Sequence, residues 1–175
     1  MSRKHFLTAV ALVAFVLSAR ILPHPANFAP LTAVAIFSGS LFPRRYAALI
    51  PLVAAVLSDI FLGFYNVMPI VWACYLLIAL ASGRWLKQSS VLRGASLTVA
   101  ASVFFFVATN LAVWAFSGMY TPNLHGLAHC FTLALPFFRN SLLGDLVYTA
   151  SLFGTYGVVR MILRTQPAHP KVVAQ

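Results

Sequence analysis

The sequence predicts an all-α integral membrane protein, a six-transmembrane-helix bundle with both termini in the cytoplasm. Three observations support this prediction. Of the 175 residues, 61% are hydrophobic and only 8% are charged, whereas a soluble domain carries about 25% charged residues. Apolar runs of helical length recur along the chain, and basic residues fall in alternate connections between them. We expect one transmembrane domain over residues 1–175.

Six apolar runs define the expected spans, and prolines, glycines or basic residues separate them. The first run follows Arg3 and Lys4 and also fits a cleavable signal peptide. Pro51 is expected to kink the third span. Residues 118–138 are expected to form a loop or a re-entrant segment before the last span. The expected spans are 5–22, 31–42, 46–64, 70–86, 95–116 and 141–163.

The charge distribution predicts the orientation. The net charge is +10, from 12 Lys and Arg against 2 Asp and Glu. A basic patch would indicate nucleic acid, but here the basic residues lie singly or in pairs between apolar runs, so a lipid bilayer is the expected partner and nucleic acid is not. With the N-terminus inside, the inner side receives 10 of the 12: Arg3, Lys4, Arg44, Arg45, Arg84, Lys87, Arg93, Arg160, Arg164 and Lys171.

The two exceptions, Arg20 and Arg139, lie on the outer side. Both acids, Asp59 and Asp145, also fall in the outer halves of their spans. Ionised groups in the hydrocarbon region cost several kcal/mol unless they are paired or hydrated, and they are functional candidates by default. One interpretation is a polar binding pocket. The other is two ion pairs that hold the bundle together, Arg139 with Asp145 and Arg20 with Asp59.

Further polar side chains are expected at the same level of the bundle. His24 and Asn27 follow the first span, Tyr65 follows the third, and Asn140 precedes the sixth. Tyrosine favours membrane interfaces and loop histidines are usually solvated, so each has a plain structural explanation as well. His125 and His129 share a face if their segment is helical, but two ligands are a weak metal signal without a third.

Cys74 lies inside the fourth span and has two interpretations. Most membrane cysteines are small apolar packing residues. The alternative is a soft thiolate ligand that faces the pocket. A disulfide with Cys130 would suit the oxidising side of the membrane, but the two residues are expected at different depths.

Three segments resemble a known group of membrane proteins: 20–28 (RILPHPANF), 57–64 (LSDIFLGF) and 135–145 (LPFFRNSLLGD). They resemble small bacterial membrane proteins that are similar to the solitary substrate-binding S-components of energy-coupling-factor vitamin transporters. This resemblance implies a six-helix, S-component-like bundle in the bacterial inner membrane that binds a vitamin-like solute near its outer face.

Within that group the chain resembles the BtuM-like vitamin B12 transporters. The resemblance implies that cobalamin is a substrate rather than an intrinsic cofactor, and that Cys74 contacts its cobalt. One departure concerns energy coupling, because the first span lacks two alanines spaced four apart, whereas Ala35 and Gly39 supply small residues at that spacing on the second span. Docking to a shared energy-coupling module is therefore doubtful.

The chain is thus expected to bind and transport a solute rather than to act as an enzyme. The expected substrate-binding residues are His24, Asn27, Asp59, Tyr65, Cys74, Arg139, Asn140 and Asp145. Two alternatives stay open. The chain can be a structural or assembly protein of the membrane, or an intramembrane aspartic protease in which Asp59 and Asp145 share a proton. Against the protease, Leu142 stands where Gly-x-Gly-Asp requires glycine.

Overall fold

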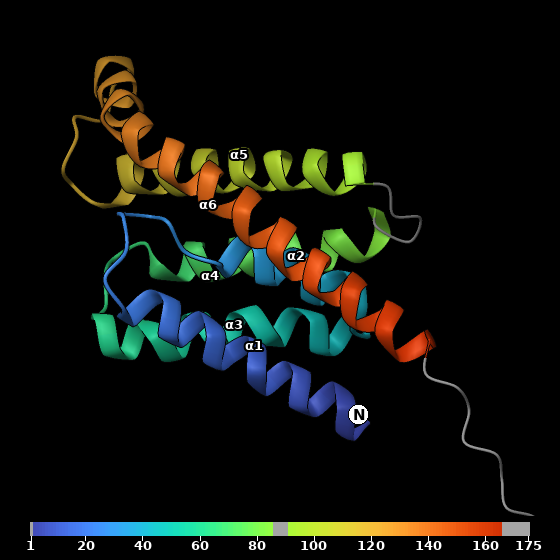
Figure 1. The fold of residues 1–175 in the computed structure, drawn as a ribbon. Coiled ribbons are helices and arrows are strands. Elements are labelled where there is room, and N and C mark those ends of the chain that lie inside the picture. Colours follow the sequence, from blue (N-terminus) through green and yellow to red (C-terminus); the bar gives the residue numbers. More distant parts are fainter. Residues whose placement is uncertain (1, 86–90, 166–175) are drawn as a thin grey trace, which may run out of the picture.

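The computed structural model describes residues 2–85 and 91–165, and within these ranges the chain folds into helices without strands (Figure 1). The all-α fold and one helix for each apolar run are thereby confirmed. Four helices are long and apolar enough to cross a membrane, namely α1, α3, α5 and α6. The bounds are α1 (Arg3–Ile21), α2 (Leu31–Leu41), α3 (Arg44–Leu62), α4 (Met68–Trp85), α5 (Val91–Phe116) and α6 (Leu124–Thr165).

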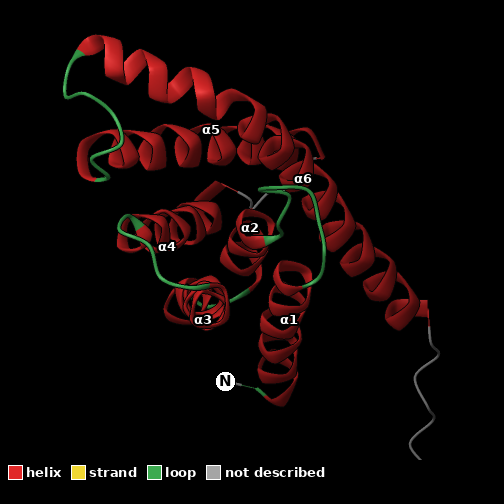
Figure 2. Cartoon of the chain, turned by 90° about the vertical axis from the view of Figure 1, so that its left-hand side faces the viewer, coloured by secondary structure: helices red, strands yellow, loops and turns green. Residues whose placement is uncertain are grey.

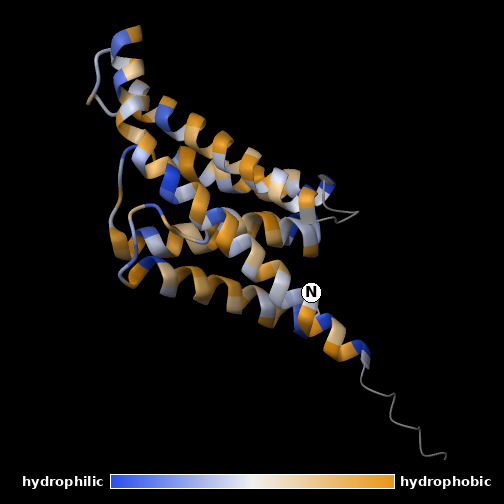
Figure 3. Cartoon of the chain, turned by 45° about the horizontal axis from the view of Figure 1, so that its top comes forward, coloured by the Kyte–Doolittle hydropathy of each residue, from blue (hydrophilic) through white to orange (hydrophobic). Residues whose placement is uncertain are grey.

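The outside of the bundle is apolar. Large hydrophobic side chains of α1, α3 and α6 are exposed, among them Phe6, Phe61 and Val158. Figure 3 shows hydrophobic residues along the lengths of the helices, with many of the hydrophilic ones near helix ends. A soluble monomer rarely exposes apolar surface on this scale, so the surface suits lipid.

Helix α2 is the centre of the bundle. It contacts every other helix, and all its residues from Leu31 to Gly39 are buried, as expected of a helix that is apolar on all sides. Its 11 residues span about 16 Å, roughly half of a 30 Å hydrocarbon core. Pro30 precedes its first residue and Pro43 follows it closely, so prolines delimit it at both ends.

The closest helix contact joins α2 to α4. A Cβ atom added to Gly39 would lie 2.2 Å from the carbonyl oxygen of Ala79, and one added to Gly83 would lie 2.7 Å from the carbonyl oxygen of Gly39. Only glycine permits such an approach of two backbones. The small-residue face formed by Ala35 and Gly39 is therefore used inside the chain.

Helix α6 differs from the sequence prediction. It runs unbroken for 42 residues from Leu124 to Thr165. The prediction that residues 118–138 form a loop or a re-entrant segment is therefore wrong from Leu124 onward. Asn123 provides this start, because its Oδ1 accepts a hydrogen bond from the Gly126 backbone N–H at 2.8 Å, which is the contact of an N-cap residue. Pro136 lies within α6 and does not interrupt it.

The basic residues gather at one end of the bundle. Figure 1 places the N-terminus, the α2–α3 connection, the end of α4, the start of α5 and the end of α6 on the same side. This basic end carries Arg3, Lys4, Arg44, Arg45, Arg84, Arg93, Arg160 and Arg164, whereas Lys87 and Lys171 lie outside the described residues. Arg20, in the last turn of α1, lies at the opposite end.

Candidate functional site

A cavity of about 560 Å³ opens at the end of the bundle opposite the basic end. Its volume is in the range of small-molecule sites, roughly 300–1,000 Å³. All six helices contribute to its lining, as do the connections after α1 and α3. The polar lining residues are Arg20, His24, Asn27, Thr32, Tyr65, Tyr75, Ser102, Thr109, Asn110, Ser141 and Asp145.

The cavity exists because α2 is short. Pro23, Pro25 and Pro30 keep the preceding segment from being helical, so the bundle has no central helix between α1 and Leu31. The α1–α2 connection crosses this region instead (Figure 2). Ala29, Leu31 and Thr32, at the start of α2, line the cavity, which therefore lies next to the N-terminus of this central helix.

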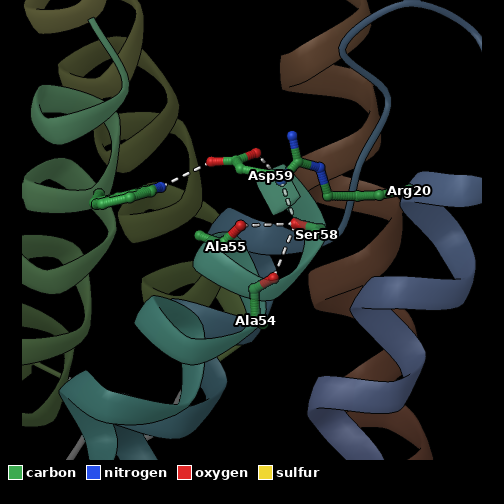
Figure 4. A network of polar contacts seen from close by, with 6 residues as sticks. Arg20, Ala54, Ala55, Ser58 and Asp59 are labelled. Carbon is green, nitrogen blue, oxygen red and sulfur yellow. Dashed lines mark hydrogen bonds and ion pairs between the residues drawn. The ribbon is translucent and has the colours of Figure 1, made fainter. Parts of the chain in front are cut away.

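An ion pair between α1 and α3 forms one side of the site (Figure 4). Arg20 Nη1 donates to Asp59 Oδ1 at 2.8 Å and also to the hydroxyl of Ser58. Ser58 Oγ in turn lies 2.8 Å from the Ala54 carbonyl oxygen and 2.9 Å from that of Ala55. The sequence prediction that Arg20 pairs with Asp59 is confirmed.

Helix α4 completes the coordination of Asp59. Trp72 Nε1 donates to Asp59 Oδ2 at 2.7 Å, so both carboxylate oxygens have a donor from another helix. Tyr65, in the α3–α4 connection, lines the cavity nearby. Burial, and next the negative charge of Asp59, raise the pKa of Tyr65, while Arg20 lowers it. The Tyr65 hydroxyl therefore stays protonated and can donate to a ligand.

Asp145 has a different environment. It is buried on α6 and lines the cavity. Its Oδ2 accepts a hydrogen bond from Ser102 Oγ of α5 at 2.6 Å, and the hydroxyl of Thr32 on α2 is also bonded to its side chain. Within residues 2–85 and 91–165, no cation forms an ion pair with it. The expected pair between Arg139 and Asp145 is thus not formed there, and Arg139 is exposed.

Aromatic rings line much of the remaining surface. Tyr75 of α4 stacks on Phe105 of α5 with ring centroids 4.9 Å apart. Phe106 of α5 and Phe138 of α6 lie 4.5 Å apart. All four residues line the cavity. Such rings present flat apolar faces to a bound molecule.

The α1–α2 connection forms part of the cavity wall. His24 and Asn27 line the cavity and are exposed. Asn27 has φ 61°, a left-handed conformation that asparagine tolerates better than most residues. The Asn140 side-chain amide donates to the Ala26 carbonyl oxygen at 3.1 Å. Asn140 therefore fixes the connection to α6 without being part of the cavity lining.

The structure divides the sequence-predicted site residues into two groups. His24, Asn27, Tyr65 and Asp145 line the cavity. The others do not: Asp59 lies behind Arg20 and orients it, and Asn140 holds the connection. Arg139 is exposed and Cys74 is buried, both outside the lining.

The cysteines and histidines form no further site among the described residues. Cys74 and Cys130 are both free and buried. The rings of His125 and His129 lie 6.4 Å apart between centroids. In the part of the chain that the structure describes, no three His, Cys, Asp or Glu side chains gather as a metal site would require.

The two acids also lack the arrangement of an aspartic protease. That chemistry needs two carboxyl groups that share a proton. Here Asp59 binds Arg20 and Trp72, whereas Asp145 binds hydroxyl groups. The two carboxyl groups have separate partners, so the geometry does not favour proteolysis.

Sequence reasoning missed the contribution of α5. Ser102, Phe105, Phe106, Thr109, Asn110 and Val113 all line the cavity. Their spacing is that of one helix face, so a search for polar residues at helical intervals within the fifth apolar run would have found Ser102, Thr109 and Asn110. Trp72 carried no such signal, because its role depends on the rotation of α4 against α3.

Comparison with known proteins gave one match. The model of a family of unknown function, DUF6580, matches residues 1–168. A search of curated proteins and a search of solved structures found no significant match.

Proposed function

This chain belongs to the DUF6580 family, and we propose that it is a multi-pass membrane protein that binds a small solute in the cavity and carries it across the membrane. The observation that carries the proposal is the cavity itself. It combines polar groups with aromatic faces at one end of an apolar bundle, which is the composition expected of a small-molecule site.

The charge distribution supports an orientation with both termini in the cytoplasm. Basic residues concentrate in cytoplasmic connections of membrane proteins, and here they concentrate at the end that holds the N-terminus and the end of α6. The cavity then opens to the outside, as an uptake protein of a bacterial inner membrane requires. Six passes follow if α2, although short, is counted as the inner part of the second pass.

The motion that we propose is a reorientation of the bundle that exposes the cavity to the inside, by analogy with the rocking of helix groups in transporters. The resemblance to solitary S-components agrees with such a motion. A corrinoid, the most specific ligand implied by that resemblance, requires Cys74 at the ligand, and this side chain is buried outside the lining. We therefore propose a small solute as the ligand, and binding of a corrinoid is a separate hypothesis with its own test.

The test compares two tryptophan substitutions on neighbouring positions of α6. Ala134 lines the cavity, whereas Leu133 is exposed on the outside. Wild-type protein, Ala134→Trp and Leu133→Trp, each in detergent micelles, are dialysed against a bacterial metabolite extract, and retained compounds are identified by mass spectrometry. We expect a compound retained by wild type and Leu133→Trp and lost from Ala134→Trp. It should also accumulate in proteoliposomes that contain the wild type.

Equal retention by all three proteins would contradict the proposal, because binding would then not depend on the cavity. A visible corrinoid spectrum in protein from corrinoid-grown cells, abolished by Cys74→Ala, would identify the ligand as cobalamin. A colourless protein that retains another compound would support the binding function and exclude cobalamin as the ligand. A protein that retains a compound without accumulating it in proteoliposomes would be a binding protein and not a transporter.

A further inference from the structure

The inference concerns the charge of the solute, and it rests on the proposed binding function. The starting observation is the carboxyl group of Asp145, which is only 4% exposed and nevertheless lines the cavity. Its hydrogen-bond partners are the hydroxyl of Ser102 at 2.6 Å and that of Thr32. Both are neutral groups.

The charges around the cavity do not cancel. Arg20 is the sole Lys or Arg in the described lining, and its guanidinium group is compensated by Asp59 at 2.8 Å. In its ionised form Asp145 therefore carries a negative charge that no described residue balances by an ion pair. The positive end of the α2 helix dipole, near Thr32, favours the ionised carboxylate but amounts to only about half a charge.

A carboxylate in such a place costs free energy until a partner arrives. Ionised groups in a membrane interior are unfavourable by several kcal/mol unless they are paired. A cationic group of the solute would supply that partner, and charge-assisted hydrogen bonds are about twice as strong as neutral ones. The site is thus prepared for a positive charge at its inner end, beside α2.

The aromatic residues agree with this assignment. The Tyr75–Phe105 and Phe106–Phe138 pairs line the same cavity. The faces of aromatic rings attract cations, and they also pack against a flat apolar body. Tyr75 is within electrostatic range of both Arg20 and Asp145, so the Tyr75–Phe105 pair lies near both charged groups.

We propose that the cavity binds a small, flat, apolar solute that carries a protonated amine, and that the ammonium group pairs with the Asp145 carboxylate. Ser102 and Thr32 hold the carboxylate in position. The Arg20–Asp59 pair at the other side provides polar groups without a net charge.

Three indole compounds with the same ring test the proposal: tryptamine is a cation, tryptophol is neutral, and indole-3-propionate is an anion. Their binding to the full chain in detergent micelles is measured by isothermal titration calorimetry. We expect tryptamine to bind at least about tenfold more tightly than tryptophol, and the anion to bind most weakly. In Asp145→Asn the preference for tryptamine over tryptophol should disappear, while tryptophol affinity stays within about twofold.

Arg139→Gln is the matched control, since it changes one exposed charge on the same helix and should leave all three affinities unchanged. Tighter binding of the anion, or a tryptamine preference that persists in Asp145→Asn, would overturn the proposal. If indole-3-propionate bound most tightly and Ala134→Trp abolished its binding, the binding function of the cavity would be supported and only the charge assignment would fail. Absence of tryptamine binding would also contradict the assignment.

Discussion

The chain has two acidic residues, and the structure uses them in opposite ways. Asp59 is 1% exposed, and its two carboxylate oxygens accept hydrogen bonds from Arg20 on α1 and Trp72 on α4. Asp145 is 4% exposed, faces the cavity and has only hydroxyl partners among the described residues. Burial is nearly the same for both, so partners and not depth distinguish them.

This difference separates a stabilising group from a binding group. The partners of Asp59 join α1, α3 and α4, and its negative charge is balanced where it stands. Asp145 lies at the contact of α2, α5 and α6, and its ionised form has no counter-ion among the described residues, so it can pair with a cationic group that enters the cavity. Removing each carboxylate without changing its size should therefore shift stability in opposite directions.

The largest effect is expected for Asp59→Asn. The amide would leave the Arg20 guanidinium without its counter-charge, and loss of one partner of a buried ion pair costs about 3–5 kcal/mol. The free energy of unfolding, measured by SDS titration in mixed micelles, should fall by that amount. A loss below about 1 kcal/mol would show that the pair behaves as an exposed one.

A double replacement controls for the loss of charge. Exchanging Arg20 and Asp59 together for Met and Leu removes both charges and keeps apolar volume, which is often nearly neutral for stability. We expect the double variant to recover most of the stability lost in Asp59→Asn. If the double variant is as unstable as Asp59→Asn, the pair stabilises the protein through its specific hydrogen bonds and not through compensation of charge.

A smaller effect is expected for Trp72→Phe. The substitution keeps an aromatic ring on α4 and removes the Nε1 donor to Asp59 Oδ2. A hydrogen bond to a charged group contributes about 1.5–3 kcal/mol, so the unfolding free energy should fall within that range. Trp114→Phe is the comparison, because its indole donates to the exposed Thr121 carbonyl oxygen at 3.1 Å. An equal loss in both variants would contradict a special role for Trp72.

The sequence could predict much of this arrangement but not the contrast. Length and hydropathy of the apolar runs predicted six helices, and the positions of Lys and Arg predicted the two unlike ends. Four of the predicted site residues line the cavity, namely His24, Asn27, Tyr65 and Asp145. These features depend on local composition, which a single chain displays directly.

The remaining features depend on how helices are rotated against one another. Ser102 and Asp145 are 43 residues apart, and Trp72 and Asp59 come from different helices, so no local pattern pairs them. The last span was predicted to begin at residue 141, whereas α6 begins at Leu124 and contains Pro136. In a long helix, packing against neighbouring helices compensates for the hydrogen bond that proline removes.

The smallest effect, and the one of opposite sign, is expected for Asp145→Asn in the empty protein. The asparagine side chain keeps the shape of the carboxyl group and can still accept from Ser102, but it cannot ionise, so it removes the cost of a buried charge that lacks a counter-ion. Groups retained for binding commonly lower stability, and their replacement restores about 1 kcal/mol. We therefore expect the unfolding free energy to rise by about this amount. A decrease like that of Asp59→Asn would mean that Asp145 also holds the helices together and that its charge is balanced within the protein.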